Sequence, residues 1–228
     1  MGRQFKGLLY FFSSNVRHSL LIFWTILMSI LVVTLTISYF LLNVEGEMAF
    51  SLTAPMYVYC GIMGFITVKE MVPFSIKMGA TRKNLYVVIA IFFLLLSLFK
   101  AIAGTIIQVL VTSMNEAIGL NNFDFLHLAQ FIDDTWYTRV VIDTAVMFFF
   151  LTLMFLLGLL FYRFGFAGAG SVLGILLVGL LLSIAKGWAW DFITNIVESF
   201  GMTFFLQMTI MSIVFYVLSF FLVRRITI

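Results

Sequence analysis

The chain has 228 residues, of which 63% are hydrophobic and only 10% are charged. A typical soluble domain has about 25% charged residues, so this sequence lacks the polar side chains that would cover a water-exposed surface. It is also far too apolar for a disordered chain. A net charge of +3 at pH 7 is compatible with nucleic-acid binding, but its meaning depends on where the basic residues lie.

The first predicted element is an amphipathic helix over residues 3–18. Phe5, Leu8, Phe12 and Val16 recur at helical spacing, which is typical of a helix lying on a membrane surface. The alternative is a plain cytosolic segment that leads into the first span. No small-residue cleavage site follows the first apolar run, so we expect that run to remain as an anchor.

Six apolar segments then follow, and a transmembrane helix needs about 20 apolar residues. They cover residues 20–43, 51–68, 85–112, 140–162, 166–185 and 203–223. We expect helices, because lipid leaves backbone groups unsatisfied in any other open structure, and the runs do not alternate as barrel strands do. The prediction is an all-α integral membrane protein, with residues 1–228 forming a single transmembrane domain of six helices.

The basic residues predict the orientation, because cytoplasmic loops carry an excess of Lys and Arg. With the N-terminus inside, ten of the thirteen are cytoplasmic: Arg3, Lys6, Arg17, Lys69, Lys77, Arg82, Lys83, Arg163, Arg224 and Arg225. Arg139 and Lys186 lie outside, and all acidic residues except Glu70 are external or near the outer face. We therefore predict that both termini are cytoplasmic and that nucleic acid is not a partner.

The largest cytoplasmic loop, residues 69–84, mixes basic and apolar side chains. The residues that we single out are Lys69, Glu70, Phe74, Lys77, Gly79, Thr81, Arg82 and Lys83. A purely solvated loop has no need of apolar residues, so we interpret this loop as a docking surface for a cytosolic partner. The alternative is a positively charged loop that only sets topology. We expect Thr81 to cap the helix that enters the membrane at Lys83.

Two external segments are predicted to lie at the outer interface. Residues 113–139 are expected to form a helix with a solvated acidic face, since the acidic spacing matches no metal motif. Residues 186–202 are too short to span and should be interfacial or re-entrant. Trp188 and Trp190 suit the headgroup level.

The fourth and fifth predicted helices are separated only by residues 163–165, which predicts a tight antiparallel hairpin. Gly170 and Gly174 on the fifth helix have the spacing that allows close approach between helices. Packing within one subunit is the favoured use of these glycines, and a dimer seam is the alternative.

Lys100 is a charged residue within the third apolar segment, where a charge is energetically unfavourable. A charged side chain at the bilayer centre costs roughly 2.5–3.5 kcal/mol on insertion scales. We expect Lys100 to face the bundle interior, with Asp143 or Glu116 as possible partners and Gln108 nearly on the same face of its helix. A structural ion pair and a substrate-path or gating role both remain open.

No catalytic constellation or metal motif is found in the sequence. Cys60 lies in an apolar run and is interpreted as a small buried hydrophobe. His18 and His127 fall on opposite sides of the predicted membrane, so they cannot share a site. An enzyme is therefore not expected.

These elements together resemble the permease subunits of ABC-2 type transporters. The sharpest local match is Met78-Gly79-Ala80-Thr81-Arg82-Lys83, which is similar to the stretch where those permeases enter their third helix. The resemblance implies that the 69–84 loop is a coupling helix seated on a separate cytosolic ATPase. It also implies two permease chains, identical or different, and two ATPase chains. ATP and Mg would be bound by the ATPase, with no cofactor on this chain.

The resemblance further implies that residues 186–202 help to form an outer gate, with Trp188, Trp190, Asp191 and Glu198 as candidates. It predicts a multi-pass protein of a bacterial cell membrane that exports an amphipathic molecule such as a peptide or lipid. A non-transport membrane sensor, immunity or assembly protein is the alternative function.

Overall fold

The computed structural model describes residues 2–41, 48–120, 122–198 and 200–224. In chain order the elements are α1 (Gly2–Phe40), β1 (Met48–Phe50), α2 (Thr53–Ile66), the π-helical turn η1 (Thr67–Met71), α3 (Val72–Lys77), α4 (Arg82–Ile118), β2 (Phe123–Phe125), the 3-10 turn η2 (Leu128–Phe131), α5 (Trp136–Ala185), α6 (Trp188–Glu198) and α7 (Met202–Val223).

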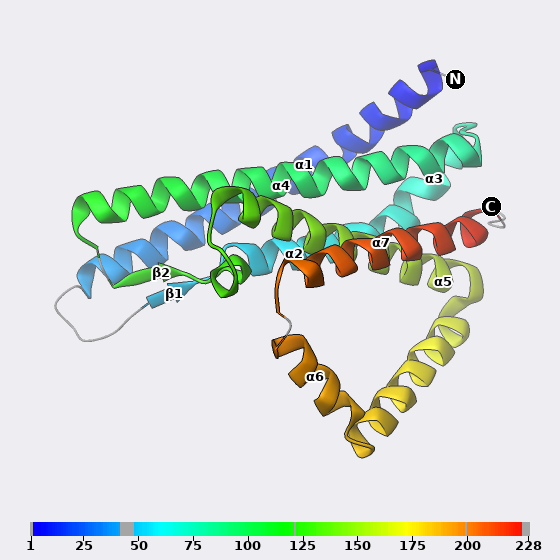
Figure 1. Cartoon of the computed structure of the whole chain (residues 1–228). Coiled ribbons are helices and arrows are strands. Elements are labelled where there is room, and N and C mark those ends of the chain that lie inside the picture. The colour runs from blue at the N-terminus through cyan, green and yellow to red at the C-terminus, as the bar shows by residue number, and fades with distance from the viewer. Residues whose placement is uncertain (1, 42–47, 121, 199, 225–228) are drawn as a thin grey trace.

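Both ends of the described chain lie at one end of a helix bundle, as Figure 1 shows. We call this the terminal end; it also holds α3 and the start of α4. The two short strands lie at the opposite end, which we call the strand end. The long helices α1, α4 and α7 and the first part of α5 run between the two ends.

Within the described residues, four helices are long and apolar enough to cross a membrane, and the number is five if one bent pair counts as a single span. The predicted mostly helical membrane protein is confirmed at this level, although six separate spans are not. The segment predicted as the second span forms α2, which has 14 residues and continues through η1 into α3. Many residues of α2 are buried, including Met56, Cys60 and Met63, so this helix lies within the bundle.

The expected surface helix over residues 3–18 is not a separate element. It is the first part of α1, a continuous helix of 39 residues, because no Gly or Pro interrupts the sequence where the two parts meet. Its apolar face is also buried instead of facing lipid: Leu8, Phe12 and Val16 are at most 8% exposed. The ring of Phe12 lies 5.4 Å from that of Phe92 on α4.

The expected antiparallel hairpin at residues 163–165 is also wrong. Gly165 has φ 65° and ψ −166°, a backbone conformation that only glycine adopts readily. The chain turns sharply there, and the second part of α5 diverges from the bundle to meet α6 in a V (Figure 1). The helical segments Gly170–Ala185 and Trp188–Asn195 meet at 90°, at Gly187, where φ is 79°.

The single helix that we expected over residues 113–139 is not formed; the segment holds the end of α4, the strand β2, the turn η2 and the start of α5. Helix α4 extends to Ile118 and ends at Gly119, where φ is 76°. Strand β2 then pairs in parallel with β1, with Met48 opposite Phe123 and Phe50 opposite Phe125. Phe123 and Phe125 are buried and Asp124 between them is exposed, which is the period-two pattern of a strand.

Glycines allow the close approach of α2 and α5. A Cβ atom at Gly64 on α2 would lie 2.4 Å from the carbonyl oxygen of Leu151 on α5, and one at Gly158 on α5 would lie 3.1 Å from the side chain of Val68 in η1, the turn that continues α2. Small residues of this kind let helix backbones approach in membranes. At Gly170 and Gly174 an added Cβ would meet nothing within 4 Å in the described part of the chain, so the close packing that we expected at these two glycines is not formed there.

Candidate functional site

The predicted docking loop is a helical turn exposed at the terminal end. We call residues 69–84 the α3 turn. Its exposed residues include all eight that the sequence singles out: Lys69, Glu70, Phe74, Lys77, Gly79, Thr81, Arg82 and Lys83. Pro73 lies in the first turn of α3, a position that tolerates its missing N–H. Basic, acidic and aromatic side chains thus share one accessible surface.

The start of α1 contacts the α3 turn directly. Gln4 donates a hydrogen bond from Nε2 to the carbonyl oxygen of Gly79 at 3.0 Å and accepts one at Oε1 from Asn84 Nδ2 at 2.6 Å. The rings of Phe11 and Phe74 are stacked with centroids 4.9 Å apart. The first turns of α1 are therefore attached to the α3 turn by both polar and aromatic contacts.

Thr81 does not cap the following helix through its side chain. It occupies the N-cap position with extended backbone and no side-chain cap bond, and α4 begins at Arg82. Its hydroxyl instead lies 3.5 Å from Gln4 Oε1. Thr81 therefore links the α3 turn to α1 through its hydroxyl, which donates to Gln4, and does not cap α4 with its side chain.

The end of α7 joins the same assembly. Arg82 donates a hydrogen bond from Nη1 to the carbonyl oxygen of Arg224, the residue that follows α7. The last carbonyls of a helix lack intrahelical partners and carry partial negative charge. A guanidinium group both donates a hydrogen bond to such a carbonyl and brings a positive charge to it. The α3 turn is thereby tied to α1 through Gln4 and to α7 through Arg82.

Lys100 is completely buried near the middle of α4. Its Nζ lies 3.7 Å from the ring centroid of Phe23 on α1 and 3.5 Å from that of Tyr59 on α2. Among the described residues it has no hydrogen-bond partner and no carboxylate within ion-pair distance. The expected pairing with Asp143 or Glu116 is therefore wrong, and the faces of two aromatic rings surround the ammonium group instead.

Asp143 belongs to a separate buried cluster that the sequence did not predict. The hydroxyl of Tyr57 donates a hydrogen bond to Oδ1 at 2.5 Å, and Nε2 of His127 lies 3.2 Å from Oδ2. Tyr57 and Tyr59 are two residues apart on α2, and side chains at that spacing do not share a helix face. Asp143 and Lys100 therefore contact different faces of α2. Gln108 is also buried on α4.

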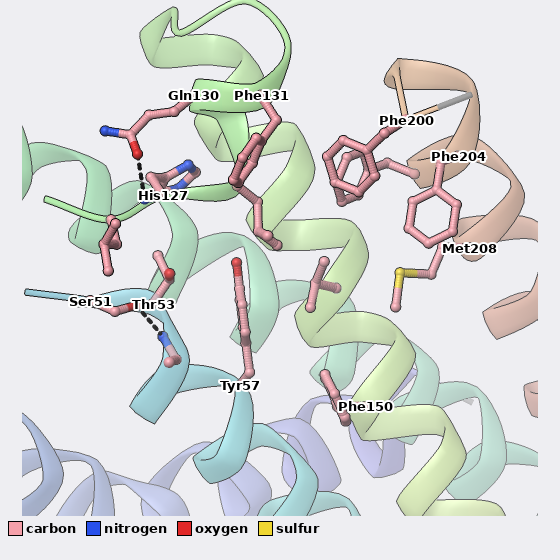
Figure 2. A pocket seen from close by; sticks show the side chains of 15 residues that line it. Ser51, Thr53, Tyr57, His127, Gln130, Phe131, Phe150, Phe200, Phe204 and Met208 are labelled. Atoms are coloured by element: carbon pink, nitrogen blue, oxygen red, sulfur yellow. Dashed lines mark hydrogen bonds between the residues drawn. The ribbon is translucent and has the colours of Figure 1, made fainter. Parts of the chain in front are cut away.

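A cavity of about 570 Å³ lies beside this cluster at the strand end. Its lining residues come from four places: Ser51 with the start of α2, the η2 region, α5, and the start of α7 with Phe200. In Figure 2, Ser51, Thr53, His127 and Gln130 form one side, while Phe131, Phe200, Phe204 and Met208 form the other. The hydroxyl end of Tyr57 points toward the region between them.

The expected outer-gate residues lie on α6 and do not line this cavity. Trp188 is 60% exposed and Trp190 is 70% exposed; Asp191 is exposed as well. Lys186 Nζ lies 4.6 Å from the ring centroid of Trp188. The side chain of Glu198 is outside the described residues. The aromatic residues that line the cavity here are Phe200, Phe204 and Phe205, whose rings contact one another.

No group of three or more His, Cys, Asp or Glu that could hold a metal ion occurs within the part of the chain that the structure describes. Cys60 is fully buried, as expected for a small apolar side chain. In comparisons with known proteins, no protein-family model, curated protein or solved structure matched this chain.

Proposed function

We propose that this chain is the permease subunit of an ATP-driven transporter of the ABC-2 type, in a bacterial cell membrane. It would export an amphipathic substrate, such as a peptide or a lipid. A separate cytosolic ATPase would supply the energy, with two copies expected beside two permease chains. This chain would hold no nucleotide of its own, because the sequence has no phosphate-binding motif.

The α3 turn is the observation that carries the proposal. It exposes Phe74, Lys77 and Lys83 at the terminal end, which the excess of basic residues assigns to the cytoplasm. It is also hydrogen-bonded to the ends of two helices that are long enough to span a membrane. A force applied by a partner at this turn would reach α1 through Gln4 and α7 through Arg82.

The bent pair at the end of α5 supports the same function. The second part of α5 and α6 form a V outside the bundle (Figure 1), and apolar residues such as Ile175, Leu177 and Val178 are more than half exposed there. An exposed apolar pair of this size fits either a lipid environment or a second permease chain. Gly170 and Gly174 lie on this segment, and an added Cβ at either would meet nothing within 4 Å among the residues that the structure describes.

Purification of the full-length chain from its native membrane in a gentle detergent tests the proposal. We expect an ATPase to copurify, and we expect Phe74→Ala and Lys77→Glu to reduce its recovery by about tenfold, since each would cost on the order of 1.4 kcal/mol of binding. The matched control is Phe40→Ala, because Phe40 is exposed at the strand end. Recovery of an active complex without any ATPase would contradict the proposal and favour a sensor, immunity or assembly protein.

A further inference from the structure

The strand-end cavity is lined by parts of the chain that are far apart in sequence. Ala54 and Tyr57 come from α2, Phe150 from α5, and Phe204 and Met208 from α7. At its edge the ring of Phe131 lies 5.9 Å from that of Phe200, with the rings edge to face. A volume of about 570 Å³ falls within the roughly 300–1,000 Å³ of small-molecule sites.

The polar side chains of the cavity are largely occupied by partners within the protein. Gln130 accepts a hydrogen bond from the backbone N–H of His127 at 3.2 Å and donates one to the carbonyl of Phe125 at 2.7 Å. Tyr57 donates to Asp143. Ser51 accepts a hydrogen bond from the backbone N–H of Ala54 at 3.3 Å. A polar ligand would have to break such bonds, whereas a hydrocarbon would leave them intact.

The cavity also lies where an amphipathic molecule would enter from lipid. At the strand end, Trp136 and Tyr137 at the start of α5 are 68% and 55% exposed, and exposed aromatics of this kind mark the membrane–water interface. Ile210 and Met211 on α7, just beyond the cavity-lining Met208, are half exposed, as expected for a lipid-facing surface. A chain bound in the cavity could therefore keep its polar head near the headgroup level.

We propose that this cavity binds the hydrocarbon chain of an amphipathic molecule. Phe150, Phe204 and Met208 contact the chain, and the ring of Tyr57 separates it from the buried carboxylate of Asp143. The assignment of this cavity as the substrate site of a transporter rests on the proposed function. The assignment of the cavity as a hydrocarbon-binding site does not depend on that function. Two sources share this chemistry: the acyl chain of a membrane phospholipid and a single-chain amphiphile free in the membrane.

Photo-crosslinking of the purified full-length chain distinguishes these sources. The chain is placed in phosphatidylcholine nanodiscs that contain either a diazirine-bearing phosphatidylcholine or a diazirine-bearing palmitic acid, and the labelled peptides are mapped by mass spectrometry. We expect saturable labelling of the peptides that contain Phe150 and Met208, which the unlabelled form of the same probe competes away. Labelling by the phospholipid identifies a membrane lipid, and labelling by palmitic acid alone identifies a single-chain amphiphile.

Two pairs of variants test whether the cavity is the labelled site. Ala54→Trp and Met208→Trp place a bulky ring in the cavity from different helices, and each should reduce labelling about tenfold. The controls are Val58→Trp on α2 and Met211→Trp on α7, since both residues are exposed and lie outside the cavity lining. Ala54 is itself exposed, so its replacement does not disturb the buried core.

Labelling that stays unchanged in both cavity variants would overturn the proposal, as would non-saturable labelling spread over all lipid-facing helices. No ATPase takes part in this measurement. Loss of the copurifying ATPase with intact saturable labelling would therefore contradict the proposed transport function alone, and the reverse result would contradict the cavity assignment alone.

Discussion

His127 and Asp143 form a buried pair, with Nε2 of the imidazole 3.2 Å from Oδ2 of the carboxylate and both side chains 1% exposed. The other ring nitrogen, Nδ1, accepts a hydrogen bond from the backbone N–H of Ala129 at 2.9 Å. An acceptor carries no proton, so the ring proton lies on Nε2 and is donated to Asp143. The pair thus connects the η2 region to α5 beneath the cavity.

Asp143→Asn should lower the stability of the fold. The carboxylate accepts hydrogen bonds from both Tyr57 and His127, whereas an amide has only one oxygen and presents an N–H to the second donor. A buried donor without an acceptor costs roughly 1–3 kcal/mol. The measurement is the thermal unfolding midpoint of the purified chain in detergent.

The control for this variant is Asp124→Asn, which makes the same chemical change at an exposed position of the strand end. We expect its unfolding midpoint to match that of the wild type. Equal midpoints for the Asp143 and Asp124 variants would show that the buried cluster contributes nothing to stability.

Lys100→Met should retain or raise stability. The substitution keeps an unbranched apolar side chain, one atom shorter, but removes a buried ammonium group that has no hydrogen-bond acceptor among the described residues. Replacing a buried charge by a well-packed apolar group is often neutral or stabilising. A loss of folding stability as large as that of a core truncation, about 2–5 kcal/mol, would contradict this expectation.

A double-mutant cycle with Phe23→Leu isolates the aromatic contact of Lys100. The ring centroid lies 3.7 Å from Nζ, and a desolvated cation–π contact contributes about 2 kcal/mol. Phe23→Leu should therefore cost more in the wild type than in the Lys100→Met background. An identical cost in both backgrounds would mean that the ammonium and the ring do not interact.

The sequence was sufficient to predict the long apolar helices, because composition and length alone determine which segments can cross a membrane. It also predicted an exposed α3 turn with a mixed surface. The contacts of the α3 turn to Gln4 and Arg224 could not be predicted from the sequence, since those residues lie far from the turn along the chain.

The failures have particular physical causes. Phe123-Asp124-Phe125 has the alternation of a strand, but three residues carry too weak a signal inside a long loop. Glycine spacing drew attention to Gly170 and Gly174, whereas close helix packing occurs at Gly64 and Gly158. Spacing shows only where an approach is possible, and the neighbouring helix decides where it happens.

Asp134 should make the start of α5 sensitive to acid. Arg139 lies beside it, with Nη2 at 2.6 Å from Oδ2, and this hydrogen bond, together with the positive charge, holds the pKa of Asp134 below its usual value of 3.8. Because the pKa of Asp134 is lower in the folded state than in the unfolded state, the ion pair stabilises the fold at pH values above the unfolded-state pKa. The contribution disappears as the pH falls through the folded pKa.

Arg139→Met tests this expectation. The difference in unfolding midpoint between wild type and variant should be largest well above pH 3.8, where the carboxylate is ionised, and should shrink as the pH falls through the lowered pKa of Asp134 and the carboxyl becomes protonated. Comparing the two proteins at each pH cancels the titration of the other acidic groups. A difference that stays constant across this range would show that the pair does not contribute to stability, as is common for exposed ion pairs.

Gly64→Ala should destabilise the bundle although it adds only one methyl group. The added Cβ would lie 2.4 Å from the carbonyl oxygen of Leu151, so α2 and α5 must separate and lose contacts along their shared face. Overpacking of this kind costs about 1–3 kcal/mol.

Gly174→Ala is the matched control, because it lies within α5 with nothing within 4 Å of the added Cβ, and alanine favours a helix over glycine by roughly 0.5–1 kcal/mol. The unfolding midpoint should fall for the Gly64 variant and stay level or rise for the Gly174 variant. If both variants shift in the same direction and by the same amount, helix propensity alone governs these positions and the close approach of α2 and α5 is not required for stability.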